Sequence, residues 1–125
     1  MLAMDTQISQ LGDYLERLRG MDAEALAVIH FGLGDAIIAR RITSDNAACR
    51  TAFPMRTIVA DALNLGSLSI LLAHNHPSGI AQPSEADIKS TRILNSILWP
   101  LGIVLKDHLI VTATEICSMK RGGHF

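Results

Sequence analysis

The sequence predicts one α/β domain in which a mixed central β-sheet is flanked by helices. Apolar residues recur at helical spacing in three segments, and short apolar runs typical of strands lie between these segments. Glycine or proline stands at most of the boundaries. The chain has 125 residues, of which 49% are hydrophobic and 18% charged, so we expect one compact domain over residues 1–125 and not a disordered or coiled-coil chain.

The first half of the chain predicts a helix, a β-hairpin and a second helix. Regularly spaced apolar residues predict the first helix over 5–19, and Gly20 is a common helix end. The apolar runs at 25–31 and 36–42 flank a glycine-containing turn and predict a hairpin. A second helix is expected over 55–64, with its apolar residues on one side.

The second half predicts a buried strand, a loop, a helix and further strands. Residues 68–74 are too apolar for a half-exposed strand, which places this strand in the centre of the sheet. Two prolines and a glycine predict a loop over 75–83. We expect an amphipathic helix over 85–98, then two strands over 102–106 and 108–113 and a short strand in the tail.

The loop and its two flanks carry the clearest chemical pattern. His74 and His76 are two residues apart at the end of an extended strand, so both imidazoles point to one side. Asp87 lies in the first turn of the next helix, where its carboxylate can return over the histidines. Ser84 is a good N-cap, and Asp87 three residues later predicts a capping-box arrangement. Two neutral imidazoles and one carboxylate suit zinc, with a fourth position open for water.

Each part of this pattern also has an ordinary interpretation. An isolated HxH pair is commonly a coincidence or two surface histidines, and an aspartate three residues after a serine is commonly only a helix cap. Their occurrence together across a proline-bounded loop favours a metal site. Catalysis would also need a base beside the water, and the candidate is Glu24, at the start of a strand expected to lie alongside.

The arrangement resembles the JAMM (MPN+) zinc metallopeptidases, whose pattern is a glutamate, a long gap and then H-x-H-P-x6-S-x2-D. In this sequence the glutamate is Glu24, HNHP begins at His74, and Ser84 and Asp87 complete the pattern without a gap or insertion. The HNHPSG string resembles the RadC-like branch in particular. The same is true of EALAVIHF at 24–31, FPMR at 53–56 and the Asp107-His108 pair, and the likeness extends over roughly residues 6–122.

The resemblance implies the JAB/MPN fold, a mixed sheet flanked by helices that is similar to that of cytidine deaminases. It implies that His74, His76 and Asp87 hold a zinc ion. It implies that Glu24 is the general base, which takes a proton from the zinc-bound water that attacks an amide bond, and that Ser84 stabilises the oxyanion. The expected activity is that of a metallopeptidase or isopeptidase acting on a peptide or an isopeptide-linked protein.

The sequence differs from the family pattern at two points. Asn75 stands where many JAMM members have serine or threonine, although asparagine is usual in the RadC-like branch. Full-length RadC-like proteins also carry an N-terminal helix-hairpin-helix module, and we expect it to be missing because only 23 residues precede Glu24. A DNA-binding role inferred from that module is therefore not expected here.

The sequence also bears on three functions other than hydrolysis. A non-catalytic, metal-stabilised interaction module would lose the base more readily than the ligands, so the presence of Glu24 and Ser84 argues against it. An accessory factor in DNA processing is a further alternative, but a net charge of −1 without a basic stripe argues against direct nucleic-acid binding. A nucleobase deaminase needs H-x-E and P-C-x-x-C, and neither motif occurs in the chain.

The start of the chain and its cysteines bear on its location. Asp5 comes early and no basic region precedes an apolar run, so no secretory signal is expected. The longest apolar runs are far shorter than a membrane span. Cys49 and Cys117 are far apart and form no CxxC motif, which is typical of free thiols in the cytoplasm.

Asp107 and His108 are expected between the two strands near the C-terminus. A structural role in a turn is the favoured interpretation. The alternative is a role in orienting a metal ligand, as groups beside a metal site commonly do.

Overall fold

The computed structural model describes residues 2–44 and 53–125. Three α-helices, five strands and two short 3-10 helices (η) make up this part of the chain. In chain order they are α1 (Leu2–Arg19), β1 (Ala25–Phe31), η1 (Leu33–Asp35), β2 (Ile37–Ser44), α2 (Met55–Leu65), β3 (Ser69–Asn75), α3 (Glu85–Leu98), η2 (Trp99–Leu101), β4 (Val104–Val111) and β5 (Ile116–Ser118).

The five strands form one mixed sheet in the order β2-β1-β3-β4-β5. Strand β3 pairs in parallel with β4, and the other neighbouring strands are antiparallel. Every residue of β3 is buried, which confirms the central position that its apolar run predicted. The predicted fold class, an α/β domain with a mixed sheet between helices, is therefore confirmed.

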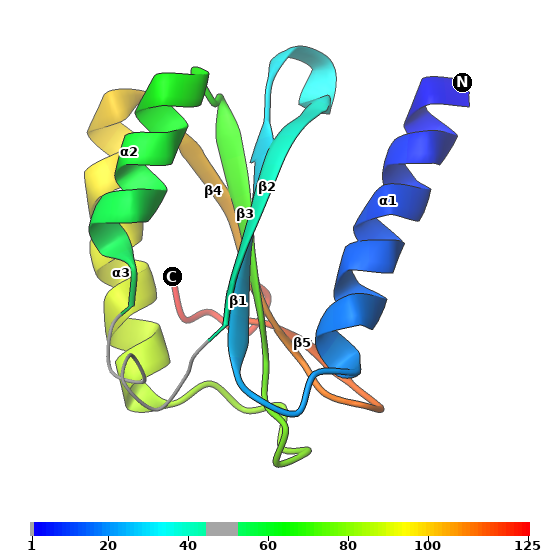
Figure 1. The fold of residues 1–125 in the computed structure, drawn as a ribbon. Helices are drawn as coiled ribbons and strands as arrows, with labels where there is room; N and C mark the ends of the chain where they lie inside the picture. Colours follow the sequence, from blue (N-terminus) through cyan, green and yellow to red (C-terminus); the bar gives the residue numbers. More distant parts are fainter. Residues whose placement is uncertain (1, 45–52) are drawn as a thin grey trace.

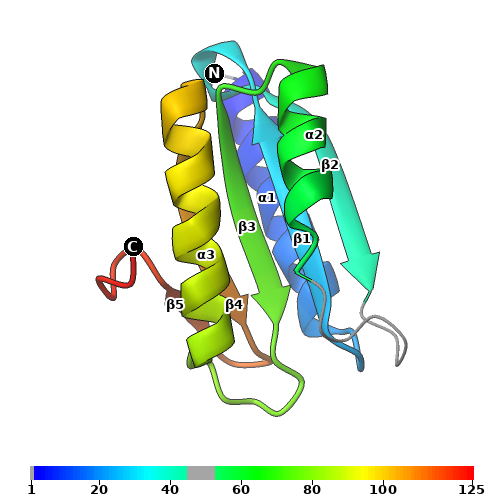
Figure 2. The same cartoon turned by 90° about the vertical axis from the view of Figure 1, so that its left-hand side faces the viewer.

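Helices cover both faces of the sheet. Figure 1 shows α2 and α3 against one face and α1 against the other, and in Figure 2 α2 and α3 lie in front of the strands. The larger apolar core lies between the sheet and the α2/α3 layer and consists of Val28, Ile58, Ala62, Ile70, Leu72, Leu94, Leu98, Ile103 and Leu105. A smaller core under α1 consists of Leu18, Ala25, Ala27 and Ala73.

The structure corrects one expectation about the C-terminal strands. The residues on either side of Asp107 do not form two strands with a turn between them, because β4 runs through this position without a break. The pairing register with β3 shifts after Leu105, so that Lys106 is an extra residue in the ladder. Such a β-bulge absorbs a residue without ending the strand. Asp107 and His108 consequently point to opposite faces of the sheet.

The loop with the candidate ligands lies at one end of the sheet. Strand β3 ends there and α3 begins there, and residues 76–84 join them at the lower end of Figure 2. Gly79 in this loop has φ +87°, a conformation that side-chain-bearing residues rarely adopt. Strand β1 begins at the same end because it runs antiparallel to β3. Three separate segments of the chain thus bring side chains to one edge of the fold.

No helix in the described part of the chain combines the length and the apolar character needed to cross a membrane. Cys117 is a free thiol, and Cys49 lies outside the described residues.

Candidate metal centre

Two imidazoles and one carboxylate converge at this end of the sheet. His74 is the penultimate residue of β3, His76 follows the strand directly, and Asp87 lies in the first turn of α3. The Nε2 atoms of the two histidines are 2.8 Å apart, and each is 3.5 Å from Oδ2 of Asp87. The three side chains are only 11%, 13% and 23% exposed. This group can hold a metal ion.

The backbone after β3 keeps His76 on the same side as His74. The N–H of His76 donates to the carbonyl oxygen of Val111 over 2.9 Å, so contact with β4 continues one residue beyond the strand. Nδ1 of the His76 ring lies 2.9 Å from the carbonyl oxygen of Ile80 and must donate to it, because a carbonyl only accepts. In the neutral ring, the lone pair of Nε2 is then directed at His74 and Asp87.

A capping box holds the third side chain, as the spacing of Ser84 and Asp87 predicted. The backbone N–H of Asp87 donates to Oγ of Ser84 over 3.0 Å, and the backbone N–H of Ser84 donates to Oδ2 of Asp87 over 2.9 Å. Burial opposes ionisation of Asp87, but the interaction with His74 and the hydrogen bonds from Ser84 outweigh it and hold the pKa of this carboxyl well below its usual value. The same oxygen therefore caps the helix and faces both imidazoles as a carboxylate.

The hydroxyl of the exposed Ser84 side chain can still donate a hydrogen bond. Its oxygen accepts the bond from Asp87, while its own hydrogen takes no part in that bond. A hydroxyl both accepts and donates, so the cap is compatible with donation to a bound molecule.

Behind His74, a third histidine fills the space between β4 and α3. His108 is 1% exposed, and its Nε2 lies 2.6 Å from Nδ1 of His74. Its Nδ1 lies 2.7 Å from Oγ1 of Thr91, which in turn donates to the carbonyl oxygen of Asp87 over 2.6 Å. Burial lowers the pKa of His108 to about 3, so this ring is neutral near pH 7.

Asn75, between the two candidate ligands, points to the opposite face of the sheet. Its Nδ2 donates to the carbonyl oxygens of Met21 and Ala23 over 3.2 and 3.0 Å, and its Oδ1 accepts from the N–H of Ala25 over 2.6 Å. Two of these three partners flank Glu24 directly. The amide of Asn75 thus ties the end of β3 to the segment that carries the candidate base.

Glu24 lies directly before β1, at the end of the sheet where β3 ends. Leu26 lies opposite His74 in the antiparallel pair of β1 and β3, and this is the last residue pair of the two strands at this end. If the extended backbone continues before β1, Glu24 shares the face of Leu26 and His74. Its side chain is exposed, which leaves it accessible to water and to a substrate.

Two members of this cluster are evident only in three dimensions. The sequence favoured a turn for His108, whereas the structure places it in the middle of a strand with both ring nitrogens bonded. Thr91 shares the buried side of α3 with Leu94 and Leu98, where packing is the ordinary role of a side chain. A signal for Thr91 was present in the sequence, because a polar residue four positions after Asp87 lies on the same helix face one turn along.

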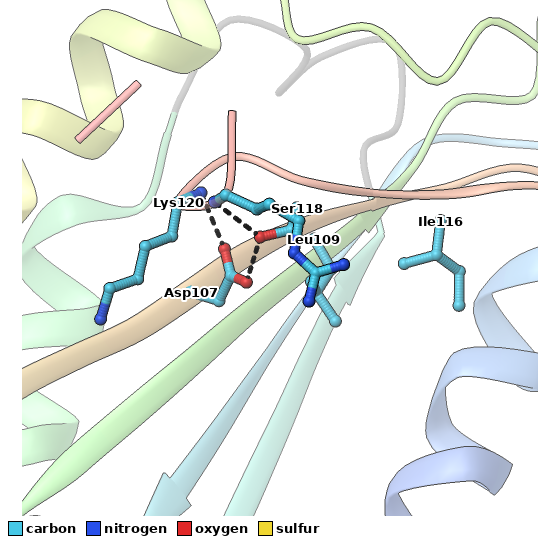
Figure 3. Close-up of a pocket in the computed structure, with 6 residues that line it drawn as sticks. Asp107, Leu109, Ile116, Ser118 and Lys120 are labelled. Atoms are coloured by element: carbon cyan, nitrogen blue, oxygen red, sulfur yellow. Dashed lines mark hydrogen bonds between the residues drawn. The ribbon is translucent and has the colours of Figure 1, made fainter. Parts of the chain in front are cut away.

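Asp107 takes no part in the candidate metal centre. It accepts hydrogen bonds from the N–H groups of His108 and Lys120 and from the hydroxyl of Ser118, and the last two are drawn in Figure 3. It lies beside a shallow cavity of about 590 Å³ on the other face of β4, which is lined by Asp107, Leu109, Ile116, Ser118, Lys120 and Arg121. These contacts fasten the C-terminal segment to the sheet and give Asp107 a structural role.

Comparison with known proteins identifies the relatives of this chain. Residues 5–124 match the family model described as the RadC-like JAB domain. The chain is 38% identical over 112 residues to a UPF0758 protein of Polaromonas sp., an alignment covering 89% of this chain and 50% of that protein. UPF0758 proteins of Finegoldia magna and Salinibacter ruber are 30% and 31% identical, over 90% and 85% of this chain and 50% and 46% of their own lengths. The chain therefore spans about half the length of these relatives.

Proposed function

Because the chain belongs to the RadC-like JAB domain family, we propose that it is a zinc-dependent hydrolase of amide bonds, a metallopeptidase or isopeptidase. The observation that supports this most is the convergence of His74 Nε2, His76 Nε2 and Asp87 Oδ2 within 3.5 Å of one another. Two imidazole nitrogens and one carboxylate oxygen are a ligand set that zinc enzymes use, with a fourth position left for water or substrate. The residues present therefore fit the ion.

When bound, zinc supplies a lowered pKa for a coordinated water and polarisation of the substrate carbonyl. The chain's own residues supply the rest of the chemistry. Glu24, whose two neighbours Ala23 and Ala25 are bonded to Asn75, accepts the proton of the attacking water and returns it to the leaving amine. The Ser84 hydroxyl, with its oxygen already engaged by Asp87, donates its hydrogen to the developing oxyanion.

The charge of the chain favours a protein substrate over a nucleic acid. A net charge of −1 gives no general attraction for phosphates, and amide hydrolysis requires none. The proposed substrate is therefore a peptide or an isopeptide-linked protein conjugate.

The test measures zinc content and hydrolysis on the same samples. We expect one zinc per chain by metal mass spectrometry, and zinc-dependent cleavage of at least one member of a broad panel of peptides and isopeptide-linked conjugates. His76→Ala should lose both, since it removes one of three protein ligands. His124→Ala, which changes a histidine outside the cluster, should keep both.

The outcomes separate the proposal from its alternative. Zinc in wild type and His124→Ala but not in His76→Ala supports the ligand set, whereas equal zinc in all three contradicts it. Full zinc occupancy without cleavage of any panel member would favour a non-catalytic, metal-stabilised interaction module.

A further inference from the structure

We propose that His108 is a positioning residue that fixes the tautomer of His74, so that His74 offers Nε2 and not Nδ1 to the metal. The inference rests on the proposed function for its purpose, because it concerns the same ligand set. It states which ring nitrogen of His74 carries the hydrogen in the folded chain, and this can be measured whether or not the protein is a catalyst.

Both nitrogens of the His108 ring have a partner. The ring is nearly inaccessible to solvent, and its centroid lies 4.7 Å from that of His74 at an interplanar angle of 63°. Nε2 faces Nδ1 of His74 at 2.6 Å, and Nδ1 faces Oγ1 of Thr91 at 2.7 Å. A buried imidazole whose nitrogens face neither a carboxylate nor water stays neutral, so it has one donor and one acceptor nitrogen.

The direction of each hydrogen bond in the series from His74 through His108 and Thr91 follows from the carbonyl oxygen at its end. The carbonyl oxygen of Asp87 can only accept, so the hydroxyl of Thr91 uses its single hydrogen to donate to it. Oγ1 of Thr91 must then accept from Nδ1–H of His108. Nε2 of His108 consequently carries no hydrogen and must accept from Nδ1–H of His74. The neutral His74 ring is left with a bare Nε2.

The tautomer of His74 matters because its Nε2 faces His76 and Asp87. Nε2 of His76 is bare for the same reason, since Nδ1 of that ring donates to Ile80. With the ionised Asp87, three electron-pair donors then face one another and none of them brings a hydrogen. A cation satisfies this arrangement. A neutral imidazole in water holds its hydrogen mainly on Nε2, so without an acceptor at Nδ1 the ring of His74 would block its own coordinating atom.

The chain of bonds also couples two ligands to each other. Thr91 is one turn beyond Asp87 on α3, and it contacts the Asp87 backbone directly. The series of hydrogen bonds that joins His74 to the Asp87 backbone therefore fixes the distance between β3 and the first turn of α3. Partners that orient metal-bound histidines in this way commonly contribute 10- to 100-fold, roughly, to metal affinity.

The test reads the tautomer directly by ¹⁵N NMR of the histidine rings in the metal-free full chain. In wild type we expect the hydrogen of His74 on Nδ1. His108→Leu removes the acceptor while keeping an apolar side chain in the buried site, and it should move that hydrogen to Nε2. His108→Gln offers a side-chain oxygen close to the position of Nε2 and should keep the wild-type tautomer.

Zinc titration with the metal alone gives the second measurement. His108→Leu should bind zinc about 10- to 100-fold more weakly than wild type, and His108→Gln should recover most of this loss. Thr91→Val should give an intermediate loss, because His108 then loses the partner that sets its own tautomer. The matched control is His30→Leu, which replaces a histidine that is equally buried on the same sheet but bonded to Ser67, and it should bind zinc as wild type does.

A hydrogen on Nε2 of His74 in wild type overturns the inference, as does an unchanged tautomer and zinc affinity in folded His108→Leu. If His108→Leu does not fold, the wild-type, His108→Gln and Thr91→Val spectra decide the matter. Failure of the proposed function is distinct, because a protein that binds no zinc or cleaves no amide still reports the tautomer of His74.

Discussion

Both faces of strands β3 and β4 carry polar residues, but the two faces use them in opposite ways. On the α1 face, Asn75 and Asp107 are bonded mainly to backbone groups of neighbouring segments. On the α2/α3 face, His74 and His108 are bonded to other side chains, and the series leads to a nitrogen directed at His76 and Asp87. Adjacent residues of each strand therefore fall into two sets. The structural set on the α1 face is Asn75 and Asp107, and the chemical set on the α2/α3 face is His74 and His108.

The difference lies in what each set leaves unsatisfied. Groups of neighbouring segments complete the bonding of Asn75 and Asp107, so these side chains hold chain segments in place and have little capacity for a ligand. The rings of His74 and His108 form a series of hydrogen bonds in one direction. In each ring Nδ1 donates, which leaves Nε2 without a hydrogen. Alternation along a strand is enough to keep the two sets apart, because neighbouring side chains point to opposite faces.

The largest effect is expected at Glu24, the proposed base. Glu24→Gln keeps the size of the side chain but cannot accept a proton, so hydrolysis should fall by about 10²- to 10⁴-fold while zinc content and fold are unchanged. Single-turnover rates and metal analysis measure the two properties. Glu16→Gln, an exposed glutamate of α1 on the opposite side of the sheet, is the control. Full activity of Glu24→Gln would show that another group is the base.

Ser84 should combine a chemical and a structural role. Ser84→Ala removes the proposed oxyanion donor and should lower the turnover number by about 10²- to 10³-fold. It also removes the cap of α3, which should lower the free energy of unfolding by about 1 kcal/mol. Kinetics and urea denaturation separate the two. A loss of stability without a loss of turnover would assign Ser84 to the helix cap alone.

A substitution at Asn75 tests whether the α1 face of the sheet supports the candidate metal centre on the α2/α3 face. Asn75→Ala removes three hydrogen bonds and leaves the N–H of Ala25 without its acceptor, so the free energy of unfolding should fall by about 3 kcal/mol. Hydrolysis should fall by about 10-fold or more because Glu24 is no longer held, while zinc content stays constant. Asn64→Ala, at an exposed position of α2, is the control. If hydrolysis per folded molecule is unchanged, the position of Glu24 does not depend on Asn75.

The smallest effect is expected at Asp107, the neighbour of His108 on the opposite face. Asp107→Asn weakens the hydrogen bonds to the C-terminal segment and should cost about 1 kcal/mol of stability, while the zinc affinity should not change. Thermal denaturation and zinc titration check both parts. A weaker zinc affinity in this variant would show that the two faces are coupled through the backbone of β4.

What the sequence determined by itself is the local part of the centre. His74, His76, Ser84 and Asp87 all lie within one strand end, one loop and one helix start. Strand alternation places the two imidazoles on one face, and the serine–aspartate spacing predicts the capping box, so short-range rules were sufficient. The same rules predicted the helices, the hairpin and the central position of β3.

Tertiary structure alone decided what surrounds those residues. The partners of His108 are 17 and 34 residues away in sequence, and Asn75 bonds a segment 50 or more residues away. These contacts depend on strand order, on the register of β3 against β1 and β4, and on the packing of α3 over the sheet. The bulge at Lys106 shows why local reasoning failed there, since polar residues that suggest a turn are accommodated once neighbouring strands supply partners.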